Sequence, residues 1–135
     1  MMAQVRDPAA MIAQMSPLLD QVRWCFVTVS NPGQAIELMR RALATFREEE
    51  GLSLIVPADA AHEADLAAAS YRRIILQVHS ALDGVGLTAA VSTALADAGI
   101  ACNVVAAFHH DHIFVPEEYA EQALAILERL AASAG

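Results

Sequence analysis

The sequence contains no lysine, and its eight basic residues, all arginine, face sixteen acidic residues. The resulting net charge of −8 argues against a nucleic-acid-binding protein, which needs a basic surface and usually has aromatic side chains beside it. The absence of lysine also excludes Schiff-base catalysis and a lysine-dependent phosphate-binding loop. We therefore expect no nucleic-acid partner and no chemistry that depends on a lysine.

Cysteine and long apolar runs are also scarce. Cys25 and Cys102 both lie in apolar, strand-like segments, which is typical of reduced core thiols rather than of a disulfide or a redox pair. No apolar run approaches the roughly 20 residues that a membrane-spanning helix needs. Asp7 and Pro8 interrupt the N-terminal region before a signal-peptide pattern can form. We expect a cytoplasmic protein with no membrane partner.

What the chain does contain is an alternation of helical and extended patterns. The apolar periodicity and the turn residues predict helices and strands in a regular order. The predicted helices cover residues 8–15, 34–41, 58–67, 87–98 and 116–130, and the predicted strands cover residues 22–30, 43–46, 52–56, 70–79, 100–108 and 112–115. Gly51 is expected to take a left-handed conformation in the first hairpin, and Gly99 to end the fourth helix in the same conformation.

This order contains an internal repeat. Residues 53–57 (SLIVP) and 112–116 (HIFVP) each end a hairpin and lead into a helix whose first turn is acidic. A β-α-β-β-α unit therefore occurs twice, over residues 22–67 and 71–130. Right-handed crossovers give such a unit an antiparallel sheet with both helices on one face. We predict an α+β, ferredoxin-like fold: an N-terminal helical segment (1–20), a first lobe (21–69) and a second lobe (70–135). The fourth strand of each lobe would come from the other lobe or from a second chain.

Residues 44–57 (ATFREEEGLSLIVP) and 78–116 resemble the hallmark segments of a family of small bacterial tandem ACT-domain proteins. The similarity extends from about Met15 to the C-terminus. Its most distinctive parts are Thr45-Phe46-Arg47 and His110-Asp111-His112. ACT domains in general are regulatory lobes that bind amino acids, so the resemblance implies a ligand-binding, non-catalytic role.

The turn from Asp83 to Thr88 is the strongest candidate for a ligand site. A loop that leads into a helix presents unpaired backbone N–H groups and the positive end of the helix dipole, both suited to a carboxylate. Glycines at 84 and 86 permit close approach, and Asp83 can accept an ammonium group. By the resemblance, this loop works together with a strand of a neighbouring lobe. The predicted ligand-binding residues are Asp83, Gly84, Val85, Gly86, Leu87, Thr88, Cys102, Asn103 and Val104. The alternative is that the glycines only form a tight turn and that Asp83 caps the helix.

Other motifs favour less specific interpretations. Residues 84–89 match a dinucleotide fingerprint, but no acidic residue ends the next strand and the chain is too short for a doubly wound sheet. The hairpin His109-His110-Asp111-His112 suggests a metal site, yet side chains on a tight hairpin diverge. His79, Ser80 and Asp83 lack the elbow motif of a catalytic triad. Arg72-Arg73 is expected to have one guanidinium in solvent and one beside an acidic residue.

The sequence therefore predicts a regulatory or sensor module that binds a small molecule, an amino acid by the family resemblance, and forms a homodimer. It predicts no enzyme activity, no catalytic residue, no cofactor and no bound metal. Two alternatives remain at this point. One is a structural dimerisation module with a degenerate pocket, and the other is a metal-binding protein that uses the His109–His112 hairpin.

Overall fold

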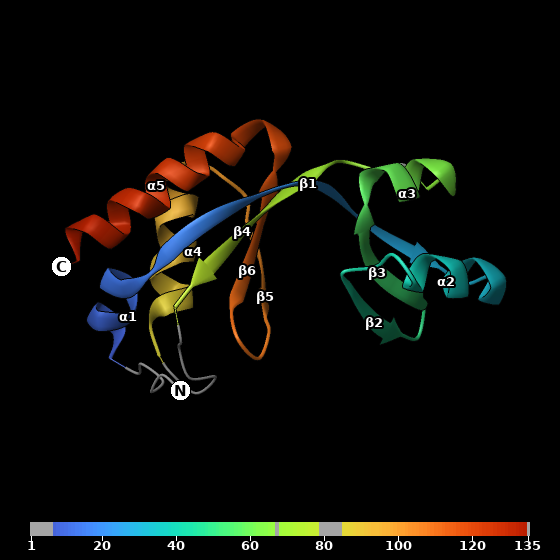
Figure 1. Ribbon diagram of the computed structural model, residues 1–135, viewed down its shortest axis with the longest axis horizontal. Coiled ribbons are helices and arrows are strands. Elements are labelled where there is room, and N and C mark those ends of the chain that lie inside the picture. Colours follow the sequence, from blue (N-terminus) through green and yellow to red (C-terminus); the bar gives the residue numbers. More distant parts are fainter. Residues whose placement is uncertain (1–6, 67, 79–84, 135) are drawn as a thin grey trace. The chain divides into compact units, whose positions relative to one another are not determined.

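The computed structural model describes residues 7–66, 68–78 and 85–134, and the chain divides into two compact units (Figure 1). Unit 1 comprises Met1–Gln21 and Arg72–Gly135, and unit 2 comprises Val22–Tyr71. Strand β1 (Ser16–Val29) belongs to both, since its first six residues lie in unit 1 and its remaining residues in unit 2. Each unit has its own hydrophobic core.

Unit 2 contains the first β-α-β-β-α copy. Its further elements are α2 (Pro32–Met39), β2 (Ala44–Glu48), β3 (Gly51–Pro57) and α3 (Ala58–Glu63). Strand β3 pairs antiparallel with both β1 and β2, which gives the strand order β2-β3-β1. Alternate residues of the strands point toward the two helices and form the core. The buried members of this core are Cys25, Val29, Leu38, Leu54, Val56, Ala60 and Ala61.

Unit 1 contains the second copy, preceded by helix α1 (Pro8–Gln14). Its elements are β4 (Tyr71–Gln77, of which Tyr71 belongs to unit 2), α4 (Leu87–Asp97), β5 (Asn103–Ala106), β6 (Asp111–Pro116), η1 (Glu117–Tyr119) and α5 (Ala120–Ser133). The strand order is β1-β4-β6-β5, and β5 and β6 form an antiparallel hairpin. The position beside β4 is thus taken by the first part of β1, so this unit draws its fourth strand from the same chain. The predicted ferredoxin-like fold with two β-α-β-β-α copies is confirmed.

The core of unit 1 lies between its sheet and its helices. Ile74 and Leu76 of β4 and Ile113 and Val115 of β6 pack against helices α1, α4 and α5. On α4, Leu87, Val91 and Leu95 form a buried apolar ridge, whereas Ala98, which continues the same spacing, is exposed. Gly99 follows α4 in the predicted left-handed conformation, with φ of +73°. On α5 the buried residues are Ala120, Ala123 and Leu127, whereas Tyr119, just before the helix, is exposed.

Helix α1 is an integral part of unit 1. Asp7 caps this helix by accepting a hydrogen bond from the Ala10 amide at 2.9 Å, and Pro8 occupies its first turn, where the missing N–H costs nothing. Met11 and Met15 are buried in the same core as α4 and α5. Residues 16–20, predicted to belong to a helical segment, instead begin strand β1. Pro17 lies near the start of β1, in the part that forms the edge strand of unit 1, and proline in sheets is largely confined to such strands.

Three further element predictions need correction. Strand β5 covers only Asn103–Ala106 of the predicted residues 100–108. Helix α3 ends at Glu63, four residues earlier than predicted, and Asp65 follows with φ of +58°. Gly51 has φ of +153°, which is outside the left-handed helical region predicted for it. A side chain at this glycine would lie 3.0 Å from the carbonyl oxygen of Val29, so close approach of β1 explains the residue.

Candidate functional site

The start of helix α4 is the part of the predicted ligand site that the structure describes most fully. Gly86 is the N-cap residue, with φ of +111°, and no side chain among the described residues caps this helix. The Ala90 amide donates to the Gly86 carbonyl at 2.9 Å and closes the first turn. The amides of Leu87, Thr88 and Ala89 therefore have no partner within the helix, as at any helix start. Among the described residues, nothing offsets the partial positive charge of this helix end, which suits an anion.

The side chains around this helix start differ in their roles. Leu87 is buried in the core and anchors the helix, so it does not present its side chain to a ligand. Val85 is 75% exposed and Thr88 is exposed. Asp83 and Gly84 lie outside the described residues, as do His79 and Ser80. Of the predicted site residues, Val85 and Thr88 are thus the ones whose side chains face solvent beside the free amides.

Gly86 lies against Pro8 of helix α1. A Cβ atom built on Gly86 would lie 2.8 Å from Cβ and 3.1 Å from Cγ of Pro8, which is closer than atoms can pack. The absence of a side chain at Gly86 therefore lets α1 approach the start of α4. Sequence reasoning expected a ligand or a neighbouring backbone at this glycine, and in the structure the first turn of α1 is there. No pattern in the sequence pairs residue 8 with residue 86.

The second group of predicted site residues lies elsewhere in unit 1. Cys102 and Val104 pack against the core, and burial raises the pKa of the Cys102 thiol. Asn103 is exposed and pairs across the hairpin with Phe114. Helix α4, 11 residues and hence about 16 Å long, separates this region from Gly86. Figure 1 shows α4 running away from its start toward the beginning of β5. The structure therefore does not bring the two predicted groups together within one chain.

The turn of the β5–β6 hairpin lies at the same end of unit 1 as the start of α4 (Figure 1). The His109 ring packs edge-on against Phe108, with ring centroids 5.0 Å apart. His112 Nδ1 instead lies 3.4 Å from Nη1 of Arg73 on strand β4. His109 and His112 thus contact different partners, whereas the His109 and His110 rings lie 6.4 Å apart between centroids. Among residues 7–66, 68–78 and 85–134, no three His, Cys, Asp or Glu side chains are grouped to hold a metal ion.

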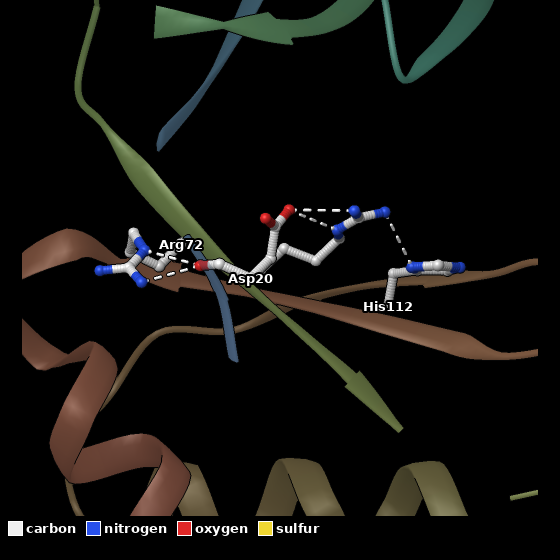
Figure 2. Close-up of polar contacts among 4 residues, drawn as sticks. Asp20, Arg72 and His112 are labelled. Carbon is white, nitrogen blue, oxygen red and sulfur yellow. Dashed lines mark hydrogen bonds and ion pairs between the residues drawn. The ribbon is translucent and has the colours of Figure 1, made fainter. Parts of the chain in front are cut away.

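A polar row crosses strands β1, β4 and β6 of unit 1 (Figure 2). The Asp20 carboxylate accepts from Nε of Arg73 at 3.0 Å and forms an ion pair with Nη2 of Arg73 at 2.9 Å. The Asp20 carbonyl accepts from Nε and Nη2 of Arg72 at 3.0 and 2.8 Å. Both arginines therefore hold the same residue of β1, and the Arg72 guanidinium, predicted to lie in solvent, donates to a backbone carbonyl from a half-buried residue. The acidic partner predicted for the pair is Asp20, which sequence reasoning did not identify.

The comparisons with known proteins agree with this architecture. ACT-domain profiles match residues 5–73 and residues 69–129, so that together they span nearly the whole chain. The chain belongs to the ACT-domain family. ACT domains are regulatory modules. The match to residues 69–129 begins just before β4 and ends within α5, so α4 is the first helix of this ACT domain. No curated protein sequence matches the chain.

Solved structures share this fold. VC0802 from Vibrio cholerae, described as a protein of unknown function and a possible transport protein, is 43% identical with a TM-score of 0.81; the alignment covers 91% of this chain and 94% of that one. Atu0741 from Agrobacterium tumefaciens is 19% identical with a TM-score of 0.69, over 87% and 89% of the two chains. The ligand-free regulatory subunit of aspartate kinase from Thermus thermophilus is 14% identical with a TM-score of 0.58, over 84% and 95%. The last two similarities concern the fold alone.

Within the described part of the chain, none of the ACT-domain helices is both long enough and apolar enough to cross a bilayer.

Proposed function

We propose that this tandem ACT protein is a non-catalytic regulatory module that binds an amino acid at the start of α4. The observation that carries the proposal is the first turn of α4, where backbone amides with no partner among the described residues lie beside the exposed residues Val85 and Thr88. These amides suit the carboxylate of a zwitterionic ligand. Membership in the ACT-domain family supports the regulatory role, and the general use of ACT domains as amino-acid-binding lobes supports an amino acid as the ligand class.

The remaining predicted contacts would come from a second copy. Cys102, Asn103 and Val104 lie at the opposite end of α4 from Gly86, so they reach the same ligand only across an interface between two chains. Strand β5 is the edge strand of unit 1 and leaves one row of backbone groups open for such pairing. A homodimer would bring residues 102–104 of one chain to the ligand of the other and would pair the open edge of β5. Sedimentation velocity at micromolar concentration tests this part of the proposal, and a purely monomeric protein would contradict it.

A thermal-shift screen of the twenty amino acids tests ligand binding directly. A ligand present at one hundred times its dissociation constant adds about 2.7 kcal/mol to the free energy of unfolding. For a chain of this length the expected rise in Tm is several degrees. If no amino acid at millimolar concentration raises Tm, the proposed ligand class is wrong.

The substitution Thr88→Glu separates binding from folding, because it should change the two in opposite directions. A carboxylate in the first turn of a helix stabilises it by about 0.3–1 kcal/mol. The same carboxylate repels a bound ligand carboxylate by about 1–4 kcal/mol at 4 Å near a protein surface. We expect Thr88→Glu to keep or raise Tm in the absence of ligand, and to weaken amino-acid binding at least about tenfold by isothermal titration calorimetry.

Thr88→Gln is the matched control, since it has the length of glutamate without the charge. It should bind the amino acid with an affinity close to that of the native protein. Equal affinity of Thr88→Glu and Thr88→Gln would show that the ligand binds away from α4. A loss of Tm in both variants would indicate instead that Thr88 supports the fold.

One observation favours a second candidate function, a structural dimerisation module with a degenerate pocket. Pro8 already occupies the space that the missing side chain of Gly86 leaves, so this glycine has a packing role without any ligand. In that case the amino-acid screen would give no shift while the protein would still sediment as a dimer. The two functions are thus distinguished by the screen and not by the oligomeric state.

A further inference from the structure

The polar row of Asp20, Arg73 and His112 lies on the sheet face of unit 1 that the helices do not cover. Ile74 and Leu76 of β4 point into the core beneath the helices, so Arg73 points to the opposite face. Ile113 and Val115 of β6 also point into the core, which places His112 on the same side as Arg73. Figure 2 shows a guanidinium between the Asp20 carboxylate and the His112 ring. The side chains of Asp20 and Arg73 are only 13% and 15% exposed.

The contact between Arg73 and His112 requires a neutral imidazole. A guanidinium can only donate hydrogen bonds, so the His112 Nδ1 atom at 3.4 Å from Nη1 must act as the acceptor. The proton of the neutral ring is then on Nε2. A doubly protonated ring has no acceptor at Nδ1, and it would place a second positive charge against the guanidinium.

We propose that this row is a pH-sensitive clasp, in which protonation of His112 displaces the Arg73 guanidinium and weakens its hold on Asp20 of strand β1. Asp20 is bound through its carboxylate by Arg73 and through its carbonyl by Arg72. These contacts join β1 to β4. Weakening them loosens the first half of β1, the strand that completes the sheet of unit 1. The proposal does not depend on a ligand at α4.

The charged groups around His112 determine the direction of the effect. Arg73 faces it from β4 and holds Asp20 of β1 on its other side, while His110 and Asp111 belong to the same hairpin. Burial lowers the pKa of His112, with further lowering from Arg73 and His110, and Asp111 opposes them. A histidine whose pKa is lower in the folded state leaves the unfolded state with more bound protons just below pH 6.5. The free energy of unfolding therefore falls as the pH drops below about 6.5.

Asp111 contributes with the opposite sign at lower pH. Burial raises its pKa, although His112 and His110 act to lower it. A carboxyl group with a raised folded-state pKa takes up its proton before the unfolded chain does, which stabilises the fold as the pH falls toward about 4. The effect of His112 is therefore best measured between pH 7.5 and 5.5, a range that brackets the ordinary pKa of histidine.

Hydrogen exchange of the full-length protein at pH 7.5 and 5.5 tests the clasp. After correction for intrinsic exchange rates, amides of residues 18–21 should lose protection several-fold at pH 5.5, while amides of β3 in unit 2 should not. His112→Gln offers a neutral amide oxygen to Arg73 and should abolish this pH dependence. His109→Gln is the matched control on the same hairpin, because His109 packs against Phe108 and not against Arg73, and it should respond as the native protein does.

Histidine NMR titration provides a second measurement that does not rely on a variant folding well. The His112 ring in the native protein should titrate below the ordinary histidine pKa and should occupy the Nε2-protonated tautomer at pH 7.5. Titration above the ordinary value, or the Nδ1-protonated tautomer, would overturn the proposal. An unchanged loss of β1 protection in His112→Gln, or no loss in the native protein, would overturn it as well.

Discussion

Replacing Asp20 by asparagine is expected to lower the free energy of unfolding of unit 1 by about 3 kcal/mol. Asparagine has nearly the same shape and still offers an oxygen to Arg73, but the guanidinium loses its counter-charge in a setting where it is only 15% exposed. An uncompensated charge that is mostly removed from water is costly, whereas the native pair offsets that cost. Urea denaturation followed by circular dichroism measures the change, and Tm should fall by roughly 10 °C.

A double substitution shows whether charge pairing is the cause. Asp20→Leu combined with Arg73→Met removes both charges, and a buried ion pair replaced by apolar side chains often retains or gains stability. The double variant should therefore be more stable than either single variant. Additive losses in the double variant would contradict this account and would point to packing or to other contacts of these residues.

The ion pairs of Arg41 provide a comparison on the surface of unit 2. Arg41 contacts Asp59 at 3.1 Å and Glu63 at 2.9 Å, and its side chain is 39% exposed. Exposed pairs of this kind contribute little because water already solvates both partners. Arg41→Ala should leave the denaturation midpoint almost unchanged. An arginine–carboxylate ion pair is thus expected to contribute more to the free energy of unfolding in unit 1 than in unit 2, because the pair in unit 1 is more buried.

The architecture could be predicted because short-range sequence patterns specify each helix and strand, and because the same order of patterns occurs twice. Several features each specify the local structure around them. They are the two hairpin ends at residues 53–57 and 112–116, the acidic helix starts that follow these ends, and Gly99 after α4. Repetition of such local signals identifies the β-α-β-β-α unit without any knowledge of distant contacts. Strand ends were less predictable, since β5 is shorter than its apolar run from 100 to 108. Apolar residues outside a strand still pack against the core, as Ile100 does.

The candidate site could be predicted only in part, because its remaining features depend on contacts between distant residues. Gly86 at the start of α4 follows from the turn pattern and from the apolar ridge behind it. Pro8 lies 78 positions earlier, and Asp20 lies 53 positions before Arg73. The positions of Pro8 and Asp20 depend on how α1 and the first part of β1 pack within unit 1. Short-range periodicity in the sequence does not specify this packing. The one available signal for Asp20 was its place as an acidic residue within an apolar run of strand-forming residues.

Replacing Gly86 by alanine is expected to lower the free energy of unfolding by about 3 kcal/mol. A residue with a side chain at φ of +111° is strained by about 1–2 kcal/mol. The new Cβ would also overlap Pro8 at 2.8 Å, and forcing α1 away from the core that Met11 and Met15 fill adds a further 1–3 kcal/mol. Denaturation by guanidinium chloride measures the total.

Gly99→Ala is the matched control for the strain alone. Gly99 also has a positive φ, of +73°, but an added Cβ there would meet no atom within 4 Å, so its cost should be about 1 kcal/mol. A double-mutant cycle with Pro8→Gly isolates the overlap, since removing the Pro8 side chain should recover most of the excess in Gly86→Ala. If Gly86→Ala costs no more than Gly99→Ala, then α1 does not pack closely on α4. The glycine would then be available to a ligand rather than needed for packing, which would strengthen the amino-acid-binding function over the structural one.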